Sequence, residues 1–259
     1  MTTPEIPSIQ GLQGTLQMKA PQQSTHSWVV SGFCFALIMM QAIAHAEELR
    51  PFEATYVWRW HGLTVASSTL RLERMGSLWT YRSTSEPRGI GRLYSERPTQ
   101  QTTLQISEQG IRPLRYEADD GTSSSDRDAH VLFDWERGRA SGVYGGVTVD
   151  MPLQPGTQDD LSIQIALMSD LIAGRVPTVF RLIDKNSAFE YRYSREGTAT
   201  LDTLIGSEQT VIYRSQKKGS ERLTRFWCAP SRGYIPVLIE SSKGTDIQWS
   251  MQIQSLTRQ

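Results

Sequence analysis

Charge of either sign is not in excess in this sequence. The 259 residues carry 27 basic and 27 acidic side chains. Proteins that bind nucleic acid or an anionic membrane surface through a general electrostatic field carry a clear excess of Lys and Arg. The composition therefore argues against polyanion binding as the main activity, and we expect no nucleic-acid partner.

Long hydrophobic runs are also missing. The main apolar stretch, residues 29–40, is shorter than the roughly 20 residues that a transmembrane helix needs. It is followed at 44–46 by Ala-His-Ala, the small-x-small pattern of a signal-peptidase site. We expect residues 1–46 to be a leader with a secretory signal peptide, with Met18 as an alternative start. Cleavage near Ala46 would release the chain into the periplasm without a stable membrane span, whereas a retained signal would anchor it to the inner membrane.

Cysteine and histidine are scarce. Cys34 falls in the leader, so Cys228 is the single cysteine of the expected mature chain and no internal disulfide can form. Its strand-like surroundings indicate a small, buried hydrophobic residue. Only His61 and His130 remain after the leader, in separate elements and without cysteines or carboxylates at metal-ligand spacing. The sequence therefore predicts no metal and no cofactor.

Motifs of catalytic sites are absent as well. The chain has no Gly-x-Ser-x-Gly elbow of the kind found in serine hydrolases. Asp159 and Asp160 are interpreted as capping residues rather than as an acid–base pair, because neighbours on a helix point about 100° apart. An envelope glycan or lipid hydrolase is the weakest alternative and would require Asp134 and Glu190 to converge in one cleft. No catalytic residue is predicted, and we expect a non-enzymatic protein.

The sequence does contain a series of short strands with period-two alternation. The first, residues 52–60, alternates aromatic and polar side chains and ends at the turn signal His61-Gly62. Similar strands, separated by Gly, Asn or Lys-Gly turns, continue to residue 253. Successive hairpins without intervening helices indicate antiparallel pairing.

One long helix, at about 158–173, interrupts the strands. Thr157 is predicted as its N-cap with Asp160 three residues later, and Gly174 as its end. Apolar side chains at helical spacing form one face of this helix: Leu161, Ile165, Met168 and Ile172. The sequence thus predicts a mainly β fold with one long helix, in which a curved antiparallel sheet or half-barrel wraps the helix in a single mature domain, residues 47–259.

Several short motifs follow one another in a characteristic order. They are FEATY (52–56), IRPLRY (111–116), FDWE (133–136), LQPGTQDDLS (153–162), and WCAP (227–230) leading to YIPV (234–237). In these motifs the chain resembles the bacterial envelope family catalogued as domain of unknown function 3108. The resemblance implies export to the periplasm, a fold similar to the lipoprotein-carrier half-barrels, and no established catalytic residues. Cys228 departs from the small or apolar residue usual there, which argues against a role for its thiol.

The aromatic side chains of the strands and the apolar face of the helix have two interpretations. They either form a packed core or, if the sheet curves too strongly for the helix to fill it, line an apolar cavity. The candidate ligand-binding residues are Tyr56, Trp58, Tyr81, Phe133, Leu161, Ile165, Met168, Ile172 and Trp227.

A Gly-rich connection after the third strand provides a second candidate site. Its side chains could bind a phosphate or carboxylate headgroup at the rim; they are Arg88, Arg92, Tyr94 and Arg97. The alternative is a solvated loop whose arginines pair with local acids such as Glu86 and Glu96.

These observations support two main hypotheses for the function. The first is a periplasmic binding or carrier protein that holds a lipid, an acyl chain or a lipoprotein segment between the curved sheet and the helix. The second is a structural or assembly factor that docks an envelope protein partner through an exposed strand edge or the loop at 88–97.

Overall fold

The structure is a computed structural model that describes residues 48–93, 96–107 and 110–258. The predicted leader, residues 1–46, lies outside this range. The strands are β1 (Phe52–Trp60), β2 (Leu63–Met75), β3 (Leu78–Pro87), β4 (Thr99–Ser107), β5 (Gly110–Asp119), β6 (Ala129–Asp134), β7 (Arg139–Tyr144), β8 (Val147–Pro152), β9 (Thr157–Gln158), β10 (Val179–Asp184), β11 (Ser187–Thr203), β12 (Gly206–Lys217), β13 (Arg222–Ala229), β14 (Ile235–Lys243) and β15 (Asp246–Arg258). The helix is α1 (Ser162–Ile172), and two short 3₁₀ turns are η1 (Gly89–Leu93) and η2 (Pro230–Arg232).

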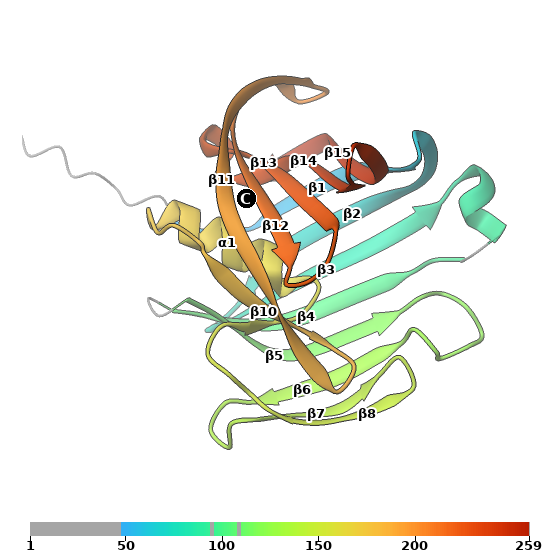
Figure 1. The fold of residues 1–259 in the computed structure, drawn as a ribbon, viewed down its shortest axis with the longest axis vertical. Helices are drawn as coiled ribbons and strands as arrows, with labels where there is room; N and C mark the ends of the chain where they lie inside the picture. The colour runs from blue at the N-terminus through green and yellow to red at the C-terminus, as the bar shows by residue number, and fades with distance from the viewer. Residues whose placement is uncertain (1–47, 94–95, 108–109, 259) are drawn as a thin grey trace, which may run out of the picture. The chain divides into compact units, whose positions relative to one another are not determined.

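All of these strands belong to one sheet. Their order is β8-β7-β6-β5-β4-β3-β2-β1-β15-β14-β13-β12-β11-β10-β9, and the pairs are antiparallel except for β9 with β10. The sheet therefore consists of two meanders joined where the first strand pairs with the last. Figure 1 shows that the sheet is strongly curled rather than flat. For the described residues, the prediction of a mainly β protein with one helix and a large antiparallel sheet is confirmed.

The sheet forms because its strands alternate as predicted. In β1, Phe52, Ala54 and Tyr56 are buried, while the residues between them are half-buried. The cross-strand neighbours of Tyr56 and Trp58 on β15, Ile253 and Met251, are buried as well. Alternation with a period of two places these side chains on one face, and that face forms the core.

The helix begins later than the sequence suggests. Thr157 and Gln158, predicted as cap and first turn, form the short strand β9. Asp159 caps the turn before α1 instead, because its Oδ1 accepts hydrogen bonds from the N–H groups of Leu161 (2.9 Å) and Ser162 (2.8 Å). The Ser162 hydroxyl in turn accepts the N–H of Asp159 at 2.8 Å. This reciprocal pair is a capping box, displaced by two residues from the predicted one.

The helix is buried on more than one face. Eight of its eleven residues are buried, among them Gln164 and Ala166 outside the predicted apolar stripe, while Ile172 is only partly buried. A helix that is apolar nearly all round lies inside a protein rather than on its surface. α1 contacts β5 and β9, and its side chains belong to the same core cluster as those of the strands.

The two edges of the sheet do not remain free along their whole length. The N–H of Asp150 in β8 donates to Oδ1 of Asn186 in the β10–β11 turn at 2.8 Å. At the other edge, β9 has only two residues, and its ladder with β10 includes the hydrogen bond from the Arg181 N–H to the Gly156 carbonyl at 3.3 Å. The contact between Asp150 and Asn186 brings the two ends of the sheet together, which limits pairing with other chains.

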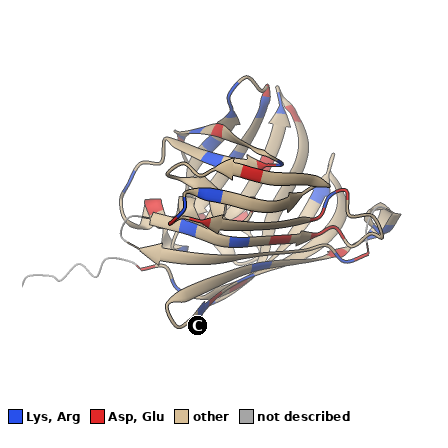
Figure 2. Cartoon of the chain, turned by 90° about the horizontal axis from the view of Figure 1, so that it is seen from below, with Lys and Arg blue, Asp and Glu red and all other residues tan. Residues whose placement is uncertain are grey.

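Charged side chains of both signs occur together on the strands. Figure 2 shows basic and acidic residues interspersed along the strands, in agreement with the neutral composition. No helix in the described part of the chain is long and apolar enough to cross a membrane.

We predict that Ile165→Ala lowers the free energy of unfolding by about 2–5 kcal/mol, because a fully buried branched side chain is replaced by a cavity. Urea denaturation measures the change. Leu204→Ala is the control, since Leu204 is 77% exposed and should change stability by less than about 0.5 kcal/mol. Equal effects of the two substitutions would contradict the buried position of α1.

Candidate functional site

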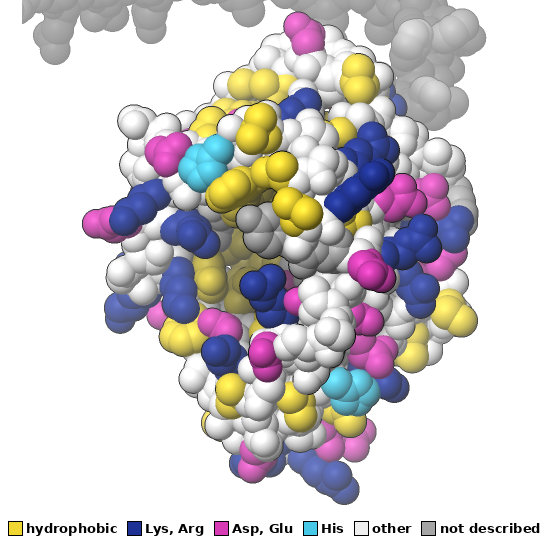
Figure 3. Space-filling model, turned by 90° about the vertical axis from the view of Figure 1, so that its right-hand side faces the viewer, with side chains coloured by type: hydrophobic (Ala, Val, Ile, Leu, Met, Phe, Trp, Pro, Cys, Tyr) yellow, Lys and Arg dark blue, Asp and Glu magenta, His cyan; other side chains and the backbone are white. Residues whose placement is uncertain are grey.

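An apolar pocket lies where β1 ends, β2 begins and η1 follows β3. Its volume is about 490 Å³, and its lining is almost entirely apolar. We call it the Trp-lined pocket, and its residues are Trp58, Arg59, Trp60, Val65, Ala66, Pro87, Ile90, Gly91, Pro98 and Trp249. Figure 3 shows hydrophobic side chains gathered around a hollow on the corresponding side of the molecule, with Lys and Arg side chains close by. Pockets of this size and character are typical of small-molecule sites.

The pairing of β1 with β15 builds the tryptophan wall. Trp60 lies opposite Trp249 in the register, and the rings of Trp58 and Trp249 have centroids 5.3 Å apart. The β1–β2 turn follows at once, with His61 and Gly62 at φ values of 44° and 80°. Because the chain reverses there, Trp60 stays at the end of the sheet and keeps 48% of its surface exposed.

A second pocket of about 490 Å³ adjoins the first, and Trp249 lines both. We call it the basic pocket, and its residues are Tyr191, Ser215, Lys217, Ser220, Glu221, Arg222, Thr224, Ser241, Lys243 and Trp249. It lies on the strands of the C-terminal meander, whereas most of the Trp-lined pocket lies on those of the N-terminal one.

Cross-strand register explains why these residues meet. A single row of opposite residues runs over successive strands from β12 to β1: Ser215, Thr224, Ser241, Trp249 and Trp60. Two residues further along β12, β13 and β14, and therefore on the same face, the row becomes basic: Lys217, Arg222 and Lys243. Small hydroxyl side chains thus separate the basic row from the core.

The two acids before α1 differ in burial, and Asp159 is the one that lies inside the sheet. Asp159 is fully buried, and its Oδ2 accepts a hydrogen bond from Thr102 Oγ1 at 2.8 Å. Burial raises the pKa of Asp159 to about 6, although the hydrogen bonds from Ser162, Thr102 and Leu161 oppose this shift. Asp159 therefore does more than cap the helix. It is a buried acid that has no cationic partner among the described residues.

Asp160 has a different environment from its neighbour. Its carboxylate accepts hydrogen bonds from the hydroxyl groups of Tyr144 and Tyr116, the latter at 3.4 Å. Burial raises its pKa, the Tyr144 hydrogen bond opposes that shift, and Asp184 raises the pKa further. Both tyrosine hydroxyl groups thus contact this carboxylate, although Asp160 is exposed, in contrast to the buried Asp159.

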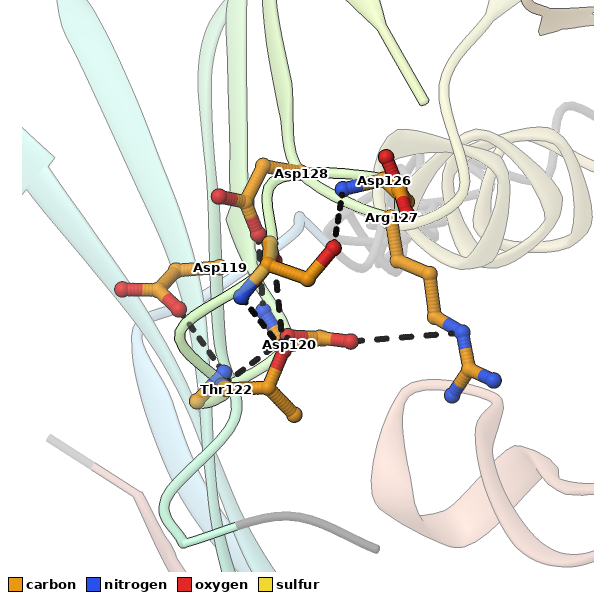
Figure 4. A network of polar contacts seen from close by, with 8 residues as sticks. Asp119, Asp120, Thr122, Asp126, Arg127 and Asp128 are labelled. Atoms are coloured by element: carbon orange, nitrogen blue, oxygen red, sulfur yellow. Dashed lines mark hydrogen bonds and ion pairs between the residues drawn. The ribbon is translucent and has the colours of Figure 1, made fainter. Parts of the chain in front are cut away.

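One group of carboxylates has a spacing that a metal could bridge. Oxygens of Asp119, Asp120 and Asp128, around the β5–β6 loop, lie within 4.8 Å of one another. Figure 4 shows that these carboxylates form contacts within the loop. Asp119 accepts a hydrogen bond from the Gly121 N–H at 2.7 Å, and Asp128 accepts one from the Asp120 N–H at 3.2 Å. Asp120 forms an ion pair with Arg127 at 4.0 Å. The group is explained by loop stability, and the absence of a metal stays a prediction.

The predicted cavity residues divide into three groups. Six are buried in the core and line neither pocket: Tyr56, Tyr81, Phe133, Leu161, Ile165 and Met168. Trp58 lines the Trp-lined pocket, and Ile172 packs partly buried against the core. Trp227 lies on the opposite face of β13 from the buried Phe226, where it packs half-buried against the core cluster and lines neither pocket. A ligand contact by any of these residues stays a prediction.

The predicted rim residues are not gathered around one site. Arg97 forms an ion pair with Glu86 at 3.5 Å, as the solvated-loop alternative expects. Arg92 Nε donates to the Pro87 carbonyl at 3.4 Å, and Arg88 lines a separate groove with residues of β1 to β3. Tyr94 lies outside the described residues.

Other candidate groups are engaged elsewhere. Asp134 pairs with Arg137 at 3.5 Å and Glu190 with Arg181 at 2.9 Å, so each potential catalytic acid has its own arginine. Burial raises the pKa of the Cys228 thiol far above its ordinary value, which keeps it protonated and unreactive. The thiol is buried as the sequence predicts.

Sequence reasoning missed Trp249 and the three basic side chains of the basic pocket. The alternation of Ser215 with Lys217 and of Arg222 with Thr224 signals that each pair shares a face. No local pattern shows which residues of β12 to β15 lie opposite one another, and this register creates the site.

Comparison with known proteins identifies the family of this chain. Residues 52–247 match the family described as "Protein of unknown function (DUF3108)". The chain belongs to this family. The resemblance inferred from the motifs of DUF3108 is therefore confirmed, and the family description assigns no activity.

Two solved structures are similar to this chain. One is a beta-barrel-like protein of the domain of unknown function DUF1849 from Brucella abortus, with a TM-score of 0.51 and 13% identity over 82% of this chain and 99% of that chain. The other is a putative exported protein with a YmcC-like fold from Bacteroides fragilis, with a TM-score of 0.37 and 11% identity over 81% of this chain and 97% of that chain. The first of these structures supports a barrel-like fold for this DUF3108 chain. The search of curated proteins found no match to this chain.

We predict that Asp159 makes the folded chain less stable as the pH rises from about 4 to 6. Unfolded Asp159 ionises around its ordinary pKa of 3.8, whereas the folded residue keeps its proton to about pH 6. The folded state thus binds more protons in this window, so stability falls with rising pH, by about 3 kcal/mol at most.

Urea denaturation of the wild type and of Asp159→Asn, from pH 4 to pH 7, measures this effect. Asn keeps an acceptor for the backbone N–H groups but does not ionise. The free energy of unfolding of the wild type should decrease relative to that of the variant as the pH rises. If the free energy of unfolding of the wild type, minus that of the variant, stayed constant or increased with pH, the burial of an unpaired acid would be contradicted.

Proposed function

We propose that this DUF3108 protein is an exported, non-enzymatic binding or carrier protein for an amphipathic acyl ligand. In this proposal the hydrocarbon chain of the ligand occupies the Trp-lined pocket. The polar end of the ligand points toward the adjoining pocket on the C-terminal meander.

The observation that carries the proposal is the shared tryptophan. Trp249 is a wall of an apolar pocket on one side and of a polar pocket of similar volume on the other. A purely apolar ligand would leave the polar pocket without a function, and a purely polar ligand would leave the apolar one. An amphipathic ligand fits both.

The energetics favour a chain of several methylene groups. Each buried CH₂ contributes roughly 0.8 kcal/mol, which offsets the lost translational freedom only when several are buried together. The half-exposed Trp60 and Ile90, at 48% and 41%, are apolar surfaces that such a chain would cover.

The proposed position of the ligand differs from the one expected from sequence. Side chains on the inner face of α1 are fully packed in the core, and none of them lines the Trp-lined or basic pocket. We therefore propose that the sheet wraps α1 as a structural plug, in the manner of a lipoprotein-carrier half-barrel, while the ligand binds beyond the helix.

A docking role receives less support. The hydrogen bond between Asp150 in β8 and Asn186 occupies part of the edge that a partner strand would need. The arginines of the loop at 88–97 are engaged in part by the chain itself, through Glu86 and the Pro87 carbonyl.

Export through a cleaved signal peptide is part of the proposal. The mature chain should be recovered from the periplasmic fraction, and its intact mass should correspond to a first residue near Glu47. Recovery of the uncleaved chain in the inner membrane would favour the anchored alternative.

We predict that Trp249→Ala weakens binding of a fluorescent hexadecanoate analogue about tenfold or more, because it removes the wall shared by both pockets. Trp249→Phe should retain most of the affinity, since an aromatic ring remains. Titration monitored by probe fluorescence gives the dissociation constants, and thermal melting shows whether each variant is folded.

Trp227→Ala is the matched control, since Trp227 lies on the opposite face of β13. It should bind the probe as the wild type does. Equal binding by Trp249→Ala and the wild type, or no binding by the wild type, would contradict the proposed site.

A further inference from the structure

We propose that the basic pocket recognises an anionic headgroup, a carboxylate or a phosphate, through Arg222 and Lys217 with Lys243 beside them. This inference rests on the proposed function, because it assumes that the acyl chain lies in the Trp-lined pocket. It adds the chemistry of the ligand's polar end.

Charge is out of balance in the basic pocket. Its lining contains three cations and one acid, Glu221. Glu221 pairs with Lys243 at 3.1 Å, and both side chains are largely exposed, so this pair contributes little. No carboxylate of the described residues forms an ion pair with Arg222 or Lys217. The pocket therefore carries uncompensated positive charge.

The strand pairing brings two of these cations together. Arg222 and Lys243 lie directly opposite each other on β13 and β14, and both are exposed. Like charges in opposite positions destabilise a sheet, here by a small amount because solvent screens both side chains. Lys217 lies opposite Tyr191, with its Nζ 3.2 Å from the centroid of the Phe189 ring, a contact that leaves its charge in place. A bound anion would remove the repulsion.

The basic pocket also contains a hydrogen-bonding group without a partner among the described residues. Ser241 lines the basic pocket and is fully buried, and its Oγ has no hydrogen-bond partner among the described residues. A buried hydroxyl without a partner costs about 1–3 kcal/mol. Ser241 also lies opposite Trp249, the residue that joins the two pockets. An oxygen of the headgroup at this junction would accept its hydrogen bond.

The positions of the cations relative to Trp249 match an amphipathic ligand. The basic row lies one step beyond the Ser215, Thr224 and Ser241 row, towards the ends of the strands. A chain lying against Trp249 would therefore place its terminal group among the cations. Arg donates two parallel hydrogen bonds to a carboxylate or a phosphate, and Lys adds a point charge.

The test compares ligands that share one chain and differ only at the headgroup. Isothermal titration with hexadecanoate, hexadecyl phosphate and 1-hexadecanol, each below its aggregation concentration, measures affinity for the wild-type mature chain. Both anions should bind at least about tenfold more tightly than the alcohol. Added salt should weaken the binding of the anions and leave the binding of the alcohol unchanged.

The outcomes separate the two proposals. Equal binding of the three ligands would overturn the headgroup assignment and leave the acyl-binding function intact. No binding of any of them would overturn both. Inorganic phosphate at millimolar concentration serves as a further competitor. Competition with hexadecyl phosphate would support an anion site. If phosphate bound as tightly as hexadecyl phosphate, the ligand of the pocket would be a free anion rather than a lipid headgroup.

Variants assign the recognition to individual residues. Arg222→Gln and Lys217→Gln should each lower the affinity for hexadecyl phosphate several-fold and leave the affinity for 1-hexadecanol unchanged. Arg214→Gln is the matched control, because Arg214 is an exposed residue of β12 between the buried Tyr213 and Ser215, and so points away from the pocket. Loss of affinity for the alcohol in Arg222→Gln, or an equal effect of Arg214→Gln on the phosphate, would contradict the assignment.

Discussion

The pairing of the first strand with the last holds this structure together. β1 and β15 are aligned from Phe52 opposite Arg258 to Trp60 opposite Trp249. This ladder joins the meander of β1 to β8 to the meander of β10 to β15, in each of which consecutive strands are neighbours. Without it, the sheet would separate into two halves, each with an uncovered inner face. The same ladder places Trp58 and Trp60 beside Trp249, so the stability of the fold and the tryptophan wall have one origin.

The two halves contribute different chemistry to the site. The N-terminal meander provides most of the apolar lining, and the C-terminal meander provides the hydroxyl and basic side chains together with Trp249. α1 is buried within the core, held at its start by the Asp159 capping box. A single helix that fills the core leaves the ends of the strands, rather than the space beside the helix, for a ligand.

The predictability of this structure from sequence follows the range of the interactions. Alternation within β1 and the apolar spacing in α1 are local, and both predicted the elements correctly. The cap was misplaced because Thr157 and Asp159 are equally suitable N-cap residues, and only the pairing of β9 with β10 decides between them. The site depends on register: Ser241 lies opposite Trp249 through a ladder with a local irregularity beyond Ser241, which no local pattern predicts.

The most direct measurement is native mass spectrometry of the mature chain, purified gently from the envelope fraction, followed by denaturing extraction and identification of what is released. The account predicts a one-to-one complex with an acyl compound that carries a carboxylate or phosphate. A chain that is consistently recovered bare, and that remains bare after incubation with such compounds, would contradict the central claim that the curled sheet holds an amphipathic ligand at the tryptophan wall.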